Sequence, residues 1–470
     1  MVSFNESSVP SKHFPLDVLI ATDNAEEAAS IAKVLKDEGY GVKFSIYDGQ
    51  TLKAIPVKAP AAVICVFTDF IEACPSIVKA LKRHFAPKDI PFIGALARHG
   101  DIKLDVFDSV IFPPAHIKQI ATRVSSMIRL SQMEREIERR VETLDKDFGI
   151  EHELVQSPQN IPFRVLFVGK ATPEFMVVIN ALQNKNVEVI AAFTSFSAFD
   201  YLHDNSFNAV VMNALEQSEP ALTISETMQR NARLYHVPTL FLVNEEHFKD
   251  HALAYDKGAR DIISASSDTE EISGRILELA NYHRIHEQLK SEFSMLGGES
   301  CVDAPSGNFN AAFFRAHMRR VTNALKPKKE PLTLIAIKAV PAASQNIDER
   351  KLSEAFGTIG QMLKSLVRMQ DVTARMSEDT FLIAFPEQGE SAALVVVERI
   401  SGIVDCAAFD SGDDANSPFT VTLETSVITM QEDDDSESLI KNALNKVTNL
   451  DRYDDMAPSQ PLLEAVSQAG

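Results

Sequence analysis

The stretches Asp17-Val-Leu-Ile-Ala21 and Arg164-Val-Leu-Phe-Val168 decide the fold of this chain. Each opens a series of short apolar segments that alternate with amphipathic segments of helical period. Ala62-Val-Ile-Cys-Val66 in the first series corresponds to Ala209-Val-Val-Met-Asn213 in the second. Strands that are apolar along their whole length are typical of parallel sheets with both faces covered by helices. The pattern therefore predicts an α/β protein with two consecutive doubly wound sheets.

Two long helical segments mark the ends of these sheets. Residues 115–144 and 271–295 carry apolar side chains at intervals of three or four. Such stripes can pack between domains or protomers, or cover the sheet from which they come, and both interpretations remain open. A polar segment with prolines at 146–162 indicates a linker. We predict a first domain at 1–145, a second with its linker helix at 146–296, a third at 297–456 and a flexible tail at 457–470.

The third domain has a different pattern. Its expected elements are a strand at 332–339, a helix at 354–368, a hairpin around Ser377, a helix at 391–404 and a strand at 419–430. This order predicts an α/β sandwich with an antiparallel element.

Composition excludes several classes of function. The 66 acidic residues outnumber the 46 basic residues and give a net charge of -20, which argues against binding a nucleic-acid backbone. No apolar stretch is long enough to cross a bilayer and the first residues lack a signal peptide, so we expect a cytoplasmic protein without membrane insertion. The four cysteines lack metal-binding spacing, and we interpret His283 and His286 as part of a solvated helix face. We therefore expect neither a metal nor a cofactor.

The two doubly wound regions resemble the receiver domains of response regulators. That family holds magnesium with an acidic pair after its first strand and accepts phosphate on an aspartate that ends its third strand. The acceptor positions here are Val66 and Asn213, and the second acidic pair is replaced by Gly169-Lys170, although Thr22-Asp23 keeps one acid in the first. Asp69 is an alternative acceptor three residues after Val66. The resemblance thus implies receivers that have lost phosphotransfer and that bind protein partners or form a homodimer.

The hairpin sequence Ser377-Glu378-Asp379-Thr380-Phe381 resembles the signature of the GGDEF diguanylate cyclases, without its glycines. Glycine permits a left-handed backbone and a close approach of triphosphate, so Glu378 is expected to be strained if the turn is kept. Lys338 stands where the family has its first metal-binding aspartate, and Thr380 replaces a family acid beside Asp379. The domain order is similar to that of receiver-receiver-GGDEF response regulators of the PleD/PopA type. The resemblance implies a degenerate cyclase domain without catalytic residues.

The inhibitory site of the same family has counterparts in Arg368, Asp371 and Arg399. In the family, an Arg-x-x-Asp motif and an arginine from the next helix bind cyclic di-GMP. A guanidinium pairs with guanine acceptors or phosphate, and a carboxylate accepts from guanine N–H groups. The alternative interpretation of Arg368 and Asp371 is a surface salt bridge at a helix end.

These observations lead to the hypothesis of a noncatalytic cyclic di-GMP effector that acts as a signalling scaffold or adaptor. Resemblance to the PopA type implies a role in cell-cycle control and regulated proteolysis, with polar localisation. Two alternatives remain, a residual diguanylate cyclase and a scaffold that binds no nucleotide.

Overall fold

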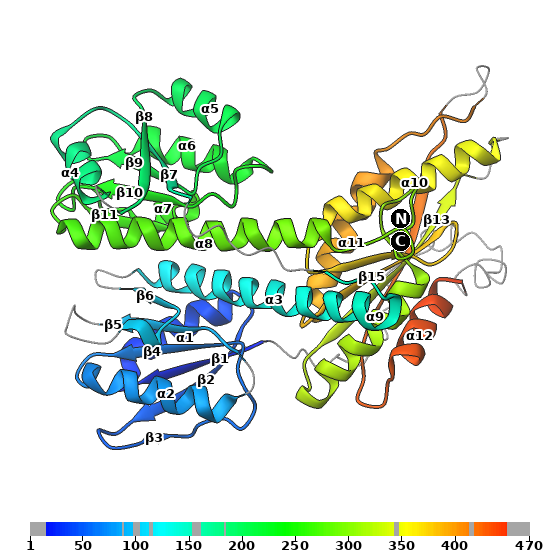
Figure 1. Cartoon of the computed structure of the whole chain (residues 1–470), viewed down its shortest axis with the longest axis horizontal. Helices are drawn as coiled ribbons and strands as arrows, with labels where there is room; N and C mark the ends of the chain where they lie inside the picture. Colours follow the sequence, from blue (N-terminus) through cyan, green and yellow to red (C-terminus); the bar gives the residue numbers. More distant parts are fainter. Residues whose placement is uncertain are drawn as a thin grey trace, which may run out of the picture. The chain divides into compact units, whose positions relative to one another are not determined.

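The structure is a computed structural model of the 470-residue chain. It describes residues 16–86, 89–96, 104–111, 116–152, 161–182, 185–342, 347–412 and 418–448. These residues fall into two compact units (Figure 1). The N-terminal unit contains residues 16–135 and 161–295, and the C-terminal unit contains residues 136–152 and 296–448, within the described ranges.

The first sheet of the N-terminal unit and its helices are formed by β1 (Asp17–Thr22), α1 (Ala25–Asp37), β2 (Gly41–Tyr47), β3 (Leu52–Lys53), β4 (Ala62–Phe67), α2 (Cys74–Phe85), β5 (Phe92–Leu96), β6 (Ser109–Ile111) and α3 (Ile117–Phe148). The strand order is β3-β2-β1-β4-β5-β6, and only the β2–β3 pair is antiparallel. Apolar side chains of α1 and α3 pack on one face, and those of α2 pack on the other.

The second sheet and its helices are formed by β7 (Phe163–Val168), α4 (Pro173–Leu182), β8 (Val187–Ala192), α5 (Ser195–Asp204), β9 (Ala209–Ala214), α6 (Glu219–Arg230), β10 (Thr239–Val243), α7 (His251–Asp256), β11 (Asp261–Ser264) and α8 (Thr269–Met295). All of its strand pairs are parallel, in the order β11-β10-β9-β7-β8. Helices α4 and α8 cover one face, and α5, α6 and α7 cover the other. Leaving β3 aside, both sheets have the doubly wound order 2-1-3-4-5.

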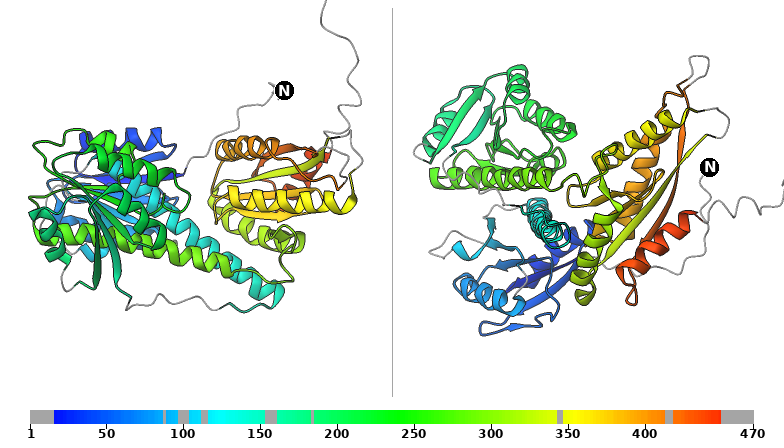
Figure 2. Two further views of the ribbon diagram at one scale, coloured as in Figure 1. Left: turned by 90° about the horizontal axis from the view of Figure 1, so that it is seen from above. Right: turned by 45° about the vertical axis from the view of Figure 1, so that its right-hand side comes forward.

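The sheet of the C-terminal unit and its helices are formed by β12 (Phe309–Asn310), α9 (Ala311–Leu325), β13 (Leu332–Pro341), α10 (Glu349–Leu366), β14 (Val372–Arg375), β15 (Thr380–Pro386), α11 (Glu390–Asp405), β16 (Val421–Thr429) and α12 (Ser436–Thr448). The strand order is β12-β14-β15-β13-β16. The pairs β14–β15, β15–β13 and β13–β16 are antiparallel. Figure 2 shows α10 and α11 on one face of this sheet and α9 and α12 on the other, as their apolar contacts require. The mixed α/β prediction is therefore confirmed.

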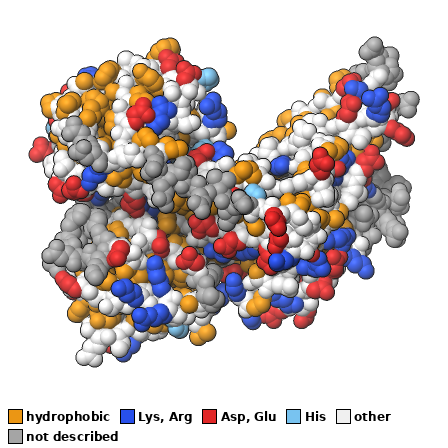
Figure 3. Space-filling model, viewed as in Figure 1, with side chains coloured by type: hydrophobic (Ala, Val, Ile, Leu, Met, Phe, Trp, Pro, Cys, Tyr) orange, Lys and Arg blue, Asp and Glu red, His pale blue; other side chains and the backbone are white. Residues whose placement is uncertain are grey.

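Two helix ends differ from the prediction in ways that matter for the site. Helix α3 continues to Phe148, into the range where a linker was expected, because its last turns pack within the C-terminal unit. Helix α10 ends at Leu366, so Arg368 lies in the following turn and not on the helix. Across the described residues, no helix combines the length and apolarity needed to cross a membrane. On the face drawn in Figure 3, acidic and basic side chains are interspersed.

Candidate functional site

Arg368, Asp371 and Arg399 come together around the turn between α10 and β14. Arg368 and Asp371 lie in this turn, which is closed by a hydrogen bond of 3.0 Å from the Asp371 amide to the Arg368 carbonyl. Arg399 reaches the same place from α11, where its guanidinium donates to the carbonyl of Leu366 at the end of α10. The side chains of Arg368 and Arg399 are exposed, as a site for a charged ligand requires.

Asp371 is buried and already accepts two hydrogen bonds. Asp371 is only 5% exposed. Oδ2 accepts from the backbone amide of Arg368 at 2.9 Å, and Oδ1 accepts from the side-chain amide of Gln388 at 3.0 Å. Burial raises the pKa of Asp371 to about 6, against the opposing effects of the Arg368 amide and charge. The surface salt bridge considered for this residue is therefore wrong in one respect, because the carboxylate is not on the surface.

Gln388 forms hydrogen bonds with both Asp371 and Arg368. Its Nε2 donates to Asp371, and its Oε1 accepts from the guanidinium of Arg368 at 3.3 Å. A planar amide with a donor at one end and an acceptor at the other has the same polarity as guanine, whose N–H groups lie beside O6. Gln388 follows β15 and is distant from the motif in sequence, so nothing in the residue pattern indicated this contact.

The end of helix α3 contacts the same turn. Arg140 donates from Nη2 to the carbonyls of Met369 and Asp371, each at 3.0 Å. Its Nε donates at 2.8 Å to Glu136, one turn earlier on the helix. Arg140 is 5% exposed, so these are interior contacts in which a charge-assisted hydrogen bond retains much of its strength.

Glu136 is the centre of a buried polar cluster. Besides Arg140, it accepts from Nε2 of His317 at 2.9 Å and from Arg139 at 3.2 Å, while Thr143 lies 3.0 Å from Nδ1 of His317. Burial by itself would raise the pKa of Glu136, but the charges of His317 and the arginines lower it to about 2. The carboxylate is thus held ionised inside the C-terminal unit.

Arg139 extends this cluster to the loop that carries Gln388. Its Nη2 donates at 3.0 Å to Glu387, which is 3% exposed. Glu387 has φ of 62°, a left-handed conformation that costs a residue with a Cβ about 1–2 kcal/mol. The ion pair with Arg139 therefore stabilises an unfavourable backbone conformation directly before Gln388.

The hairpin between β14 and β15 carries the predicted degenerate active-site residues. Ser377, Glu378 and Asp379 form its tip, and Thr380 begins β15 opposite Lys338 of β13. Oδ1 of Asp379 accepts from the hydroxyls of Ser377 at 3.0 Å and Thr380 at 2.8 Å. The strain considered for Glu378 is not present, because its φ is not positive. The hairpin has adopted a turn that does not need glycine.

A hollow of about 490 Å³ lies beside this tip and is lined partly by Lys338, Glu378 and Asp379. Arg375 donates two hydrogen bonds, of 3.1 and 2.6 Å, to the carbonyl of Glu378 and pairs with Asp303 at 3.2 Å. The tip is therefore tied down by protein groups, and the ammonium of Lys338 borders the hollow.

The predicted phosphoacceptor positions have no acidic group. Val66 is fully buried in β4, and nearby Asp23 uses both carboxylate oxygens to accept from backbone amides of residues 68–70. Asn213 donates at 3.1 Å to the carbonyl of Lys170 and accepts from Leu215 at 3.1 Å. These side chains have structural hydrogen bonds or packing where a magnesium cage would need free carboxylates.

The interpretation of His283 and His286 as a solvated helix face is wrong. His283 is 5% exposed, and the side chain of His286 is 12% exposed. The reason is that His236, in the loop between α6 and β10, packs its ring against both, with ring centroids 5.4 and 5.2 Å away.

Residues 350–452 match the family model described as diguanylate cyclase, GGDEF domain. The match contains the α10–β14 turn, the hairpin and Arg399. It indicates a GGDEF-like domain in the C-terminal part of the chain.

The chain is also similar to the response regulator PleD of Caulobacter vibrioides (strain NA1000 / CB15N), with 23% identity over 245 residues that cover 50% of this chain and 52% of PleD. PleD of strain ATCC 19089 of the same species matches equally. The chain thus spans about half the length of the curated relatives it matches. Together the matches support an architecture of receiver and GGDEF domains.

Solved structures with local similarity include the GGDEF domain of FimX from Pseudomonas aeruginosa, with 16% identity, a TM-score of 0.30 and coverage of 33% of this chain and 95% of that one. Another is the GGDEF domain of DgcB from Caulobacter crescentus in complex with c-di-GMP, with 12% identity, a TM-score of 0.28 and coverage of 33% and 93%.

Proposed function

We propose that the C-terminal unit binds cyclic di-GMP through Arg368, Asp371 and Arg399 and does not synthesise it. The observation that carries the proposal is the amide of Gln388, which joins Asp371 to Arg368 with the donor and acceptor order of a guanine base. A pair of groups that holds this amide is suited to hold guanine in its place.

Binding at this site requires three local changes. Gln388 leaves Asp371, the ionised carboxylate accepts from the guanine N–H groups, and Arg368 pairs with the guanine acceptors. Arg399 exchanges the carbonyl of Leu366 for a phosphate oxygen, a stronger partner because it is charged. Arg399 is exposed, so this exchange needs no opening of the core.

Synthesis is disfavoured by the groups around the hairpin. A cyclase holds a dication with two acids and brings a triphosphate to the turn, and the dication's charge dominates such a site. Here an ammonium, Lys338, lies opposite a threonine, Thr380, and the remaining acid, Asp379, is occupied by two hydroxyls. The unit is therefore an effector domain.

The contacts of α3 supply a route from ligand binding to the rest of the chain. Arg140 holds the turn of Arg368 and Asp371, and Arg139 holds Glu387 beside Gln388. A ligand that displaces Gln388 changes the free energy of both contacts, and it switches the protein as far as its affinity differs between the two arrangements. The receiver-like domains would then recruit protein partners or a second copy, in cell-cycle control and regulated proteolysis as the PopA type implies.

Calorimetry with cyclic di-GMP tests the proposal. We expect wild-type protein to bind at about 1 μM or tighter, which corresponds to about -8 kcal/mol. Arg368→Ala should lose at least about tenfold, since it removes a charge-assisted contact. Arg350→Ala is the matched control, because Arg350 is exposed at the start of α10, whereas Arg368 follows the other end of that helix. Absence of binding heat for the wild type, or equal affinity in Arg368→Ala, contradicts the proposal.

A further inference from the structure

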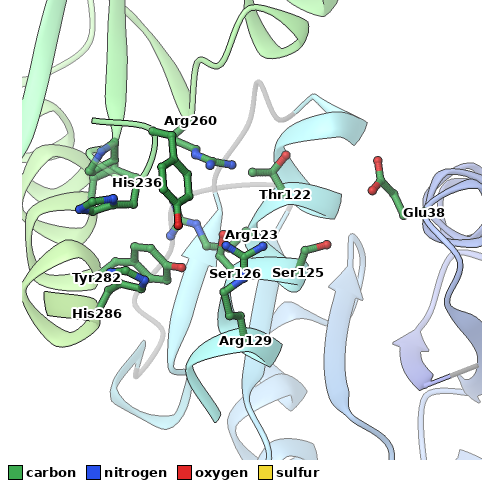
Figure 4. Close-up of a pocket in the computed structure, with 13 residues that line it drawn as sticks. Glu38, Thr122, Arg123, Ser125, Ser126, Arg129, His236, Arg260, Tyr282 and His286 are labelled. Carbon is green, nitrogen blue, oxygen red and sulfur yellow. The ribbon is translucent and has the colours of Figure 1, made fainter. Parts of the chain in front are cut away.

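Three histidines and one glutamate meet in the N-terminal unit, far in sequence from the nucleotide site. His283, His286 and Glu287 lie on α8 at positions i, i+3 and i+4, which is one face of the helix. His236 faces them from the loop between α6 and β10. Figure 4 shows His236 and His286 on the same side of a pocket of about 170 Å³, whose other side is formed by residues of α3 such as Arg123 and Arg129.

The ligand atoms are close enough to share one ion. One nitrogen of His236, one nitrogen of His283 and one oxygen of Glu287 all lie within 4.8 Å of one another. Nε2 of His236 is 2.9 Å from Oε1 of Glu287, and Nδ1 of His286 is 3.5 Å from the same oxygen. A tetrahedral zinc ion with bonds of about 2.0–2.2 Å places its ligand atoms about 3.4 Å apart. Movements of up to about 1.4 Å, within the reach of side-chain rotation, bring these atoms to that separation.

His283 supplies an independent observation that points to a ligand. It is 5% exposed, and neither ring nitrogen has a hydrogen-bond partner among the described residues. Leaving buried polar atoms unpaired is costly, and native proteins rarely do it without an unseen partner. A metal ion close to Glu287 and His236 would satisfy one of these nitrogens.

The carboxylate of Glu287 has one oxygen directed toward the histidines and one toward a lysine. Lys290 lies 3.6 Å from Oε2 of Glu287, which leaves Oε1 for the histidines.

We propose that His236, His283 and Glu287 bind one zinc ion, with His286 beside them. Two imidazole nitrogens and one carboxylate form a set that zinc accepts in tetrahedral geometry, in which the fourth position is left for water or another ligand. The ion would join the α6–β10 loop to α8 within the second doubly wound domain. It would thereby fix the part of α8 that borders the pocket shown in Figure 4.

The test uses the full chain without a histidine tag. Metal analysis after dialysis against zinc should give one zinc ion per chain, and titration with cobalt(II) should give the intense visible absorption of a tetrahedral site. His283→Ala and Glu287→Gln should each weaken zinc binding at least tenfold. His203→Ala is the matched control, because His203 is an exposed histidine on α5 of the same domain.

Each result of these measurements either supports or overturns the proposed zinc site. If His283→Ala fails to fold, as judged by circular dichroism, the conservative Glu287→Gln variant and the cobalt spectrum of the wild type still test the site. A wild type that binds no stoichiometric zinc, or a Glu287→Gln variant that binds it as tightly as His203→Ala, overturns the proposal. Cyclic di-GMP binding is measured separately, so failure of one proposal leaves the other standing.

Discussion

Lowering the pH from 7 to 5 is expected to weaken cyclic di-GMP binding about tenfold, because the guanine N–H groups need the ionised form of Asp371. Burial raises the pKa of this carboxyl from 3.8 to about 6. The ionised fraction is then about ten elevenths at pH 7 and about one eleventh at pH 5, and the apparent dissociation constant rises by the ratio. Affinity is therefore retained above pH 6 and lost as the pH falls through that value.

The effect of Asp371 ionisation on binding can be distinguished from effects of the neighbouring groups. Guanidinium and phosphodiester groups in general keep their charges in this range, and the amide of Gln388 is neutral. The raised pKa of Asp371 has the opposite effect on the stability of the free protein, which decreases as the pH rises, whereas binding strengthens. Because the pKa is higher in the folded state than in the unfolded state, the contribution of this group to stability is complete below about pH 4 and is lost as the pH rises through 6. Weaker binding at pH 5 thus cannot arise from unfolding at this residue.

Calorimetric titrations at several pH values between 5 and 7.5 would measure the effect, with Asp371→Asn as the control. The amide cannot ionise, so the variant should bind weakly and without pH dependence in this range. A wild-type affinity that is constant from pH 5 to 7, or an equal slope in Asp371→Asn, would refute the role given to the carboxylate.

Three further outcomes follow from the same contacts. Gln388→Ala should bind cyclic di-GMP about tenfold more tightly by calorimetry, because it removes an internal competitor whose hydrogen bonds contribute about 1–2 kcal/mol net; unchanged affinity would show that the amide does not compete. Arg140→Ala should lower the free energy of unfolding of the C-terminal unit in urea by about 3 kcal/mol, since it leaves Glu136 less compensated and two carbonyls without a donor; a loss below about 1 kcal/mol would contradict a structural role for this contact. Purified protein with GTP and magnesium should form no cyclic di-GMP in a chromatographic assay, and product formation would restore the cyclase alternative.

The order of secondary structure could be predicted because it depends on local patterns. The apolar strand expected at 332–339 is β13 (Leu332–Pro341), and the helix expected at 354–368 is α10 (Glu349–Leu366). Its end was placed two residues late, since the apolar spacing continues to Val367 while the backbone turns there to close on Asp371. Helical period alone does not identify the residue at which capping contacts replace the helix.

The candidate site could be predicted only in part, for a reason that its contacts make clear. Gln388 meets Asp371 across 17 residues of sequence, and Arg140 meets the same turn across 231 residues. Such contacts depend on how β15 and α3 are placed, and neither residue has a distinctive spacing. The prediction that His283 and His286 form a solvated helix face was wrong for the same reason. The helical spacing of these residues contains no information about the loop that carries His236.

The left-handed backbone of Glu387 and the buried charges around Glu136 both depend on the length of α3. Its earlier residues, such as Val124 and Ile128, pack on the first sheet, whereas Glu136, Arg139 and Arg140 have their partners in the C-terminal unit. A buried ionic cluster is a weak source of stability compared with apolar packing, but it is specific in geometry, because displacing one partner leaves a buried charge uncompensated. Arg139 pairs with Glu387 in its left-handed conformation, and Gln388 reaches Asp371 from the same loop. Helix α3 therefore stabilises the arrangement in which the Gln388 amide occupies the position that we propose for guanine, and a ligand that displaces the amide must overcome the contacts of that helix.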